Sequence, residues 1–238
     1  MFRQYQSTYK VFLVLLLGFF SICAMAQKNE IGGGLGIMYY TGDLARKLII
    51  SNVRPAGTVF LRHNVNDHIS VRASFTGGKL VGNDNKPLDA FATARNASFN
   101  IFISEFAGSF EYYFLDFRSE RAVVNWSPYF HGGVGIFGML GQQNKNATYS
   151  DIQITVPLGA GFRYQMDKKW AFGVEFGARV TFFDYLDNIS QGDIFNKNFQ
   201  YGNKNDNDLY YFAGFTVSYT FYKVICPTIP LKQGYGRR

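Results

Sequence analysis

The stretch Trp170-Ala171-Phe172-Gly173-Val174-Glu175-Phe176-Gly177-Ala178-Arg179 alternates between two kinds of side chain. Its even positions are all apolar, whereas its odd positions from Gly173 onward carry glycine and the opposite charges of Glu175 and Arg179. A repeat of two residues places alternate side chains on opposite faces of a β-strand. The stretch is therefore predicted to be a strand with one wholly apolar face and one polar face.

Seven further segments show the same alternation. Each is about ten residues long, which is the length of a tilted strand that crosses a membrane. We therefore predict an all-β fold, an eight-stranded antiparallel up-and-down transmembrane β-barrel of the small outer-membrane type. The further segments lie within residues 31–40, 58–65, 69–76, 102–114, 129–136, 154–165 and 211–221.

The connections between these segments alternate between short and long. Outer-membrane barrels have this asymmetry, with the short turns on the periplasmic side, and an even number of strands brings both chain ends to that side. The short turns are expected at 66–67 and 166–168, with the longer connection 115–126 on the same side, and the long polar spans are expected near 41–54, 79–98, 141–151 and 182–207.

A soluble β-sandwich is the alternative fold, because its half-buried strands also alternate. Its polar faces would be rich in Lys, Glu and Asp, whereas only 17% of this chain is charged and its polar faces carry mainly Gly, Ser and Thr. A narrow barrel lumen favours small residues and compensated charges. Aromatic residues make up 18% of the chain, which fits a lipid-facing band with interfacial girdles. The girdle candidates are Tyr39, Tyr40, Trp126, Tyr129, Tyr164, Trp170 and Tyr210.

Ionisable residues on the polar faces are predicted to point into the lumen. An eight-stranded barrel is just wide enough to be filled by side chains, and buried charges have to pair. Four arginines and three glutamates therefore predict a salt-bridge network that fills the lumen, with a proton or ion path as the alternative interpretation. The set comprises Arg62, Arg72, Glu105, Glu111, His131, Arg163, Glu175 and Arg179.

No residue pattern predicts catalysis, a metal site or a cofactor. His131 could act as a base in an outer-membrane hydrolase or acyltransferase, but the sequence near it lacks the Ser or acid that this chemistry needs. The run from Asn203 to Asp208 could offer oxygen ligands to Ca²⁺ through Asn203, Asn205, Asp206, Asn207 and Asp208, but it lacks the spacing of an EF-hand and is interpreted as a solvated turn. We expect a chain that is not an enzyme, with no cofactor and no small-molecule substrate.

The N-terminus has the features of a secretory signal peptide. Arg3 and Lys10 precede an apolar run over 11–22, and Ala24-Met25-Ala26 supplies the small residues of a cleavage site. Lipoprotein processing at Cys23 is the alternative, although Ile22 replaces the small residue that this processing requires. The predicted division is a signal peptide over 1–26, an outer-membrane barrel over 27–222 and a basic periplasmic tail over 223–238, for a chain exported through the general secretory pathway.

The positive charge is concentrated in that tail. Cleavage after Ala26 removes two basic residues and lowers the net charge from +7 to +5. Nucleic-acid binding would need a basic stripe across the fold, so no nucleic acid is expected. Cys226 remains as the only cysteine after cleavage, either as a free thiol or in an intermolecular bond. The possible partner contacts are Cys226, Lys223, Lys232, Arg237 and Arg238.

The sequence contains the runs Glu30–Gly36, Tyr39–Leu44, Val156–Gly161, Trp170–Glu175, Arg179–Asp187 and Val217–Phe221, followed by Cys226-Pro227. These runs resemble a known family, the PorG-like outer-membrane barrels of the Bacteroidetes type IX secretion system. The resemblance extends over nearly all of the mature chain, and it implies an accessory component in outer-membrane lipid that associates with the periplasmic PorK–PorN ring and is not the translocation channel. A lipid-modifying enzyme and a small-solute porin are the alternatives.

Overall fold

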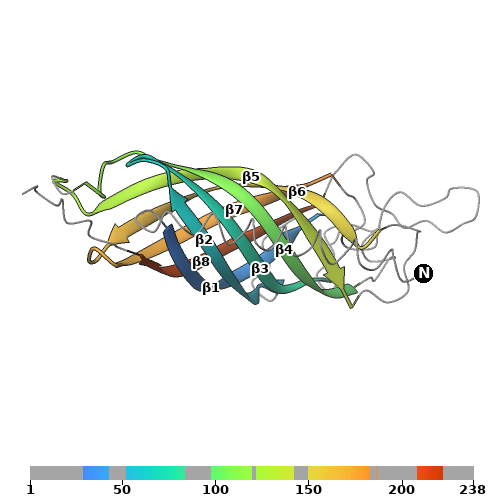
Figure 1. The fold of residues 1–238 in the computed structure, drawn as a ribbon. Coiled ribbons are helices and arrows are strands. Elements are labelled where there is room, and N and C mark those ends of the chain that lie inside the picture. Colours follow the sequence, from blue (N-terminus) through green and yellow to red (C-terminus); the bar gives the residue numbers. More distant parts are fainter. Residues whose placement is uncertain are drawn as a thin grey trace, which may run out of the picture.

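The chain folds into a closed antiparallel β-barrel, as the alternation predicts. The computed structural model describes residues 29–42, 52–83, 98–119, 122–141, 150–182, 186 and 208–221. Each strand pairs with the next one along the chain and the last pairs with the first, so the strands run obliquely around one axis (Figure 1). The strands are β1 (Asn29–Thr41), β2 (Arg54–Asn64), β3 (Ile69–Asn83), β4 (Ser98–Tyr113), β5 (Trp126–Leu140), β6 (Ile152–Gln165), β7 (Trp170–Thr181) and β8 (Leu209–Thr220).

The first and last strands close the barrel through a continuous ladder. β1 pairs with β8 from Glu30 opposite Thr220 to Thr41 opposite Leu209. On its other side, β1 pairs with β2 from Asn29 opposite His63 to Met38 opposite Arg54. Closure leaves no exposed sheet edge, which removes the tendency of edge strands to pair with other chains.

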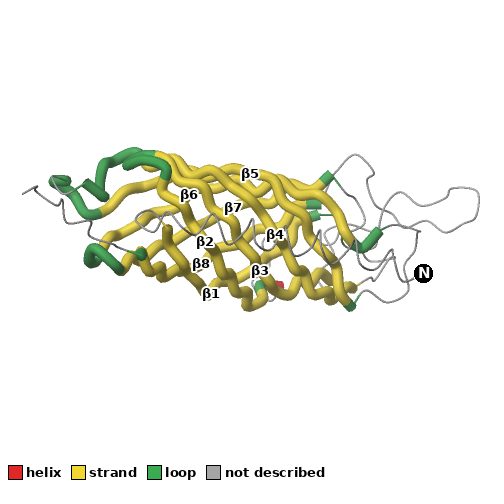
Figure 2. The backbone as a smooth tube through the Cα atoms, viewed as in Figure 1, coloured by secondary structure: helices red, strands yellow, loops and turns green. Residues whose placement is uncertain are grey.

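The short connections gather at one end of the barrel, called here the turn end (Figure 2). At 65–68, the Asn66 side chain accepts hydrogen bonds from the backbone N–H groups of His68 and Ile69, at 2.9 and 2.7 Å, which is the turn chemistry that asparagine favours. The 166–169 turn and the longer 114–125 connection share this end. The opposite end is called the loop end. There β3 continues to Asn83, beyond Lys79, where a loop was expected.

The outward face of the barrel is apolar along every strand. Leu35, Phe110 and Phe215 have exposed fractions of 78%, 68% and 73%. Trp126, Tyr164 and Trp170 are also exposed near strand ends, as a girdle requires. The prediction is wrong for the other four girdle candidates, because Tyr39, Tyr40, Tyr129 and Tyr210 are buried.

Inward-facing glycines make room for large side chains on the neighbouring strand. Gly32 lies opposite Phe60, and a methyl group at Gly32 would collide with that ring. Gly161 stands in the same relation to Tyr129, its partner across the β5–β6 ladder. Much of the glycine excess therefore lies within strands, where close approach of a ring requires it.

The proposed signal peptide over 1–26, the basic tail with Cys226 over 223–238 and the run 203–207 lie outside the described residues. Among the residues that the structure describes, no helix has the length and apolar character needed to cross a membrane.

Candidate functional site in the lumen

An alternating chain of charges fills the half of the lumen near the turn end. The charged network, defined as Glu30, Arg62, Arg72, Glu111, Arg163 and Glu175, draws its residues from six strands. Its centre is Arg62, which donates from Nε and Nη2 to Glu111 at 2.6 and 3.0 Å and from Nη1 to Glu30 at 3.1 Å. This bidentate geometry suits the planar guanidinium.

Two further arginines extend the network on either side. Arg163 Nη2 lies 2.6 Å from Glu30 Oε2. Arg72 Nη1 lies 2.6 Å from Glu175 Oε2, and its Nε lies 3.3 Å from Glu111 Oε1. The order Arg163, Glu30, Arg62, Glu111, Arg72, Glu175 alternates in sign, so each buried charge has an opposite neighbour, as burial requires.

Tyrosine and phenylalanine side chains complete the surroundings of these charges. The Tyr113 hydroxyl donates to Glu111 Oε2 at 2.6 Å. The guanidinium carbons of Arg62 and Arg72 lie 4.8 and 5.6 Å from the ring centre of Phe60, within the range of a cation–π contact. Asn64 also donates to Glu30, at 2.5 Å. The network is therefore closely packed and extensively hydrogen-bonded.

A separate ion pair lies between the charged network and the loop end. Arg179 Nε lies 3.6 Å from Glu105 Oε2, and Glu105 accepts a 2.5 Å hydrogen bond from the Tyr210 hydroxyl. The Arg179 guanidinium lies 5.1 Å from the ring centre of Phe212. With this pair, the buried part that the structure describes holds four arginines and four glutamates in contact.

His131 lies inside the barrel between these two groups of charges. It is 5% exposed, and its ring packs over Gly159 and Gly177. Neither ring nitrogen has a hydrogen-bond partner among the described residues. His131 is thus buried in the lumen, far from the exposed rim position that a catalytic base would need.

The lumen near the loop end is filled differently, by an apolar cluster. Its members include Phe99, Ile101 and Ile103 of β4. Leu186, from the β7–β8 connection, is fully buried in the same cluster, and its N–H donates to Asp208 Oδ2 at 2.9 Å. The other members are Met38, Tyr40, Ala56, Leu80, Phe137, Met139, Tyr210 and Phe212.

Two described residues of the 114–125 connection, Phe117 and Arg118, pack against the barrel at the turn end. Phe117 packs on Tyr113, with ring centres 5.2 Å apart. Arg118 donates to the Asn66 carbonyl at 3.2 Å and to Ser70 Oγ at 3.0 Å. Burial and the nearby Arg163 lower the pKa of the Arg118 guanidinium to about 10, so it is charged at neutral pH. The described side chains of this connection thus pack over the charged network at the turn end.

The structure brings all eight sequence-predicted lumen residues into the barrel interior. Seven of them form ion pairs, and His131 does not. Sequence reasoning missed Glu30, which joins Arg62 to Arg163 and balances the four arginines. It also missed the apolar cluster. Glu30 could have been found, because it continues the inward parity of Gly32 and Gly34.

The arrangement as a whole is suited to a closed barrel. Opposite charges fill one half and apolar side chains the other, so neither half offers a continuous aqueous path. None of the predicted residues forms a constellation of nucleophile, base and oxyanion donors of the kind that acyl transfer needs. The described residues contain no group of three or more His, Cys, Asp or Glu side chains placed to hold a metal ion.

The chain is similar to solved structures of small outer-membrane barrels, and the match to Neisserial surface protein A (NspA) supports the fold. Neisserial surface protein A (NspA) is 10% identical, with a TM-score of 0.52, and the match covers 81% of this chain and 97% of that chain. The N-terminal β-barrel domain of Pseudomonas aeruginosa OprF is 11% identical over 81% and 97% of the two chains, with a TM-score of 0.43. Ail of Yersinia pestis, in complex with sucrose octasulfate, is 11% identical over 81% and 98%, with a TM-score of 0.45.

Sequence comparison gives a family and no individual relative. The model of a family described as "Domain of unknown function (DUF6089)" matches residues 9–228. No curated protein sequence matches the chain.

Proposed function

The chain belongs to the DUF6089 family, a domain of unknown function, and we propose that it is an outer-membrane barrel that anchors protein secretion machinery. In this proposal it is exported through the general secretory pathway, resides in outer-membrane lipid and binds the periplasmic ring of a type IX secretion system. It acts as an accessory component and does not conduct the secreted protein.

The apolar outer face supports the membrane location. Exposed apolar side chains cover every strand, whereas soluble monomers rarely expose a patch beyond a few hundred Å². Leu35 lies at the middle of β1 and is 78% exposed. Arginine on the lipid face of a barrel costs about 2–4 kcal/mol at the bilayer midplane. Leu35→Arg should therefore reduce recovery of folded barrel from membranes, and Leu35→Phe should not. Equal recovery of the two variants would favour a soluble barrel.

The closed lumen is the observation that carries the functional proposal. The charged network fills one half, the apolar cluster fills the other, and Phe117 and Arg118 pack over the turn end. Such a barrel can bind a partner through its outer surfaces and not through its interior. At the turn end, Val123 of the 114–125 connection is 98% exposed, which leaves an apolar side chain available to a partner.

The resemblance to PorG-like barrels supports the identity of the partner. It rests on runs such as Tyr39–Leu44 and Arg179–Asp187, and it implies contact with PorK- and PorN-like ring proteins. The basic tail over 223–238, which contains Cys226, is the segment that we propose makes this contact on the periplasmic side.

Affinity purification from native membranes tests the anchoring role. A full-length chain should co-purify with the ring proteins, and a chain ending at Val224 should lose most of them. Cys226→Ser in the full-length chain separates an intermolecular disulfide from contacts made by the basic side chains. Equal recovery of ring proteins with the full-length and shortened chains would remove the docking role of the tail. Their absence from both would contradict the anchoring function itself.

The lipid-modifying enzyme and the small-solute porin have less support. The best candidate base, His131, is buried in the lumen, and the lumen is filled by paired charges. Stepwise conductance of the purified barrel in planar bilayers would favour the porin. Loss of a lipid-modifying activity on His131→Ala, with the barrel still folded, would favour the enzyme.

A further inference from the structure

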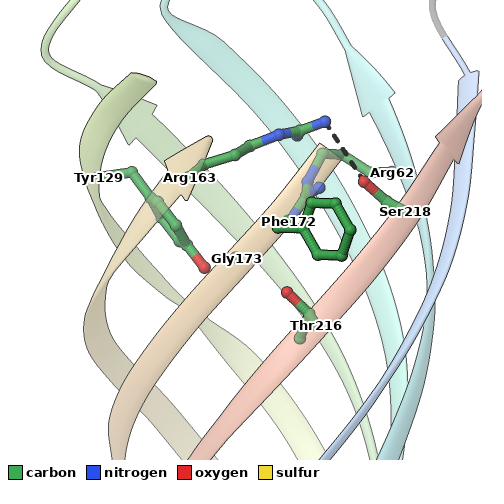
Figure 3. Close-up of a pocket in the computed structure, with 7 residues that line it drawn as sticks. All are labelled: Arg62, Tyr129, Arg163, Phe172, Gly173, Thr216 and Ser218. Atoms are coloured by element: carbon green, nitrogen blue, oxygen red, sulfur yellow. Dashed lines mark hydrogen bonds between the residues drawn. The ribbon is translucent and has the colours of Figure 1, made fainter. Parts of the chain in front are cut away.

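The charged side chains of the strands point into the barrel, with one exception. Arg62 and Arg163 show the usual arrangement, because both lie in the lumen, where Arg163 Nη2 donates to Ser218 Oγ at 3.4 Å (Figure 3). Lys79 of β3 lies instead on the outward register and is exposed. Within the strands that the structure describes, Lys79 is the only Asp, Glu, Lys or Arg residue on the outward face.

Lys79 lies at the level where the apolar band of the barrel ends. It follows Ile69, the first residue of β3, by ten residues. At about 3.3 Å per residue and a strand tilt of about 40°, this corresponds to about 25 Å along the barrel axis, which is the height of the apolar band of outer-membrane barrels. The outward residues of β4 beyond this level, Asn100 and Ser98, are polar and exposed. Lys79 is therefore placed at the depth of lipid headgroups at the loop end.

The surroundings of Lys79 combine hydrogen-bond donors with apolar surface. Phe102 is its partner across the β3–β4 ladder, and the Phe102 ring extends over Gly77, where a Cβ would lie 3.2 Å from the ring. Asn100 and Ser104 flank Phe102 on the outward face of β4. Both are diagonal neighbours of Lys79, at a separation of about 7–8 Å. An ammonium, an amide and a hydroxyl group thus border one aromatic ring.

We propose that Lys79 binds the phosphate group of an anionic lipid in the leaflet at the loop end. Asn100 and Ser104 donate further hydrogen bonds to the phosphate oxygens. The acyl chains pack on apolar side chains nearer the middle of the membrane, where Phe75 and Phe106 are paired and half-exposed. This inference rests on the membrane location proposed above, and it adds a lipid class and a binding site.

Charge favours a lipid over a second copy of the chain as the occupant. Lys79 makes no ion pair with any residue that the structure describes, so its positive charge has no protein counter-ion there. The described strands carry no Asp or Glu on their outward faces, so the lipid-facing strands of a second copy would supply no carboxylate. Lipid phosphate is the negative group present at this depth, and it attracts lysine at a membrane surface.

Quenching of tryptophan fluorescence by brominated lipids tests the proposal at the site itself. The full-length chain carries Phe102→Trp as a reporter beside Lys79, and Trp126→Phe and Trp170→Phe remove the two native tryptophans. It is reconstituted into vesicles of phosphatidylcholine and phosphatidylglycerol, with brominated acyl chains on one lipid or the other. The reporter should show a preference of about fivefold for phosphatidylglycerol, the effect of one lysine near an anionic surface.

The possible quenching results distinguish this inference from the membrane location on which it rests. Equal quenching by the two brominated lipids would overturn the lipid site and leave the membrane location intact. Quenching by neither lipid would contradict the membrane location, and the lipid site with it.

Variants of Lys79 separate its charge from the other basic groups of the chain. Lys79→Gln should reduce the preference at the reporter to near one, and Lys79→Arg should keep it, in barrels that still shift mobility on heating. Lys169→Gln is the matched control, because Lys169 is also exposed but lies in the turn at the opposite end, and it should leave the preference unchanged. An unchanged preference in folded Lys79→Gln, or an equal loss in Lys169→Gln, would overturn the proposal.

Discussion

The two halves of the lumen are both filled by side chains, which are charged in one half and apolar in the other. Near the turn end, the charged network from Arg163 to Glu175 crosses six strands. Near the loop end, side chains such as Ile103 and Phe137 form an apolar cluster. The backbone is a single continuous barrel, so inward residue identity alone makes the difference.

The two halves should respond differently when single side chains are removed. Apolar contacts are non-directional and roughly proportional to buried area, so the loop-end cluster should lose stability gradually as volume is removed. A buried ion network tolerates loss of one member poorly, because the remaining charge stays buried without compensation. The charged half should therefore be the more sensitive to single substitutions, and measurements of the free energy of unfolding test this difference.

The largest effect is expected at the centre of the charged network. Arg62→Ala leaves Glu30 and Glu111 without their shared partner, and breaking a buried pair in this way costs about 3–5 kcal/mol in the free energy of unfolding. Urea unfolding of the barrel in lipid vesicles, followed by gel mobility, measures that change.

A matched control separates the charge from its volume. Replacing Arg62, Arg163, Glu30 and Glu111 together by apolar residues of similar size removes two opposite pairs of ions, keeps the packing and leaves Arg72 paired with Glu175, and such replacements are often neutral or stabilising. The quadruple variant should therefore be more stable than Arg62→Ala. A cost below about 1 kcal/mol for Arg62→Ala, the level of an exposed salt bridge, would mean that water screens the network and that the halves do not differ as proposed.

The apolar half should show a large but graded response. Ile103 is fully buried in the cluster, and truncation of such a residue to alanine costs about 2–5 kcal/mol, against about 0.5–1.5 for Ile103→Val. The same unfolding assay compares the two variants. A cost for Ile103→Val as large as that for Ile103→Ala would contradict a dependence on volume.

Strand parity was sufficient to predict the barrel and most of its charged interior. Alternation placed Arg72, Glu111 and Arg163 inward because a one-residue shift would have put charges on the apolar face. The same parity contradicts the assignment of Tyr129 to the interfacial girdle, since Tyr129 lies two residues before the inward His131. Tyr129 is buried, so parity, and not position near a strand end, determines the side on which it lies.

The apolar cluster could not be predicted in the same way. In residues 98–103, Phe99, Ile101 and Ile103 lie on the inward face and Ser98 and Asn100 on the outward face. The apolar side is therefore inward here, whereas in the rest of β4 the outward Phe106 and Phe110 are the apolar side, so polarity alone does not assign the face. Leu186 comes from a connection, and no local pattern says that a connection returns to the interior. Periodicity detects only a difference in polarity between the two faces of a strand. Tertiary packing determines which connections enter the interior.

The contact that holds Leu186 should give a smaller effect. Asp208 accepts hydrogen bonds from the Tyr40 hydroxyl at 2.5 Å and from the Leu186 N–H at 2.9 Å. Asp208→Asn keeps the shape but removes the charge, and hydrogen bonds to charged groups contribute about 1.5–3 kcal/mol. Limited proteolysis at the loop end should become faster in this variant. A digestion pattern identical to that of the wild type would show that the carboxylate does not secure Leu186.

The smallest effect is expected at the cover of the charged half. Arg118 lies 4.2 Å from the ring centre of Tyr113 and 4.8 Å from that of Phe117, and cation–π contacts contribute about 0.5–1 kcal/mol near a surface. Arg118→Gln should therefore lower the free energy of unfolding by about 1 kcal/mol. The folded-state pKa of about 10 lies below the usual value of 12.5, so the guanidinium is charged in both folded and unfolded chains at any pH well below 10. The deficit of the variant should then be the same at neutral and mildly alkaline pH. A deficit that disappears between those conditions would mean that Arg118 loses its proton much earlier, and that the turn end of the lumen is less accessible to water than the charged network implies.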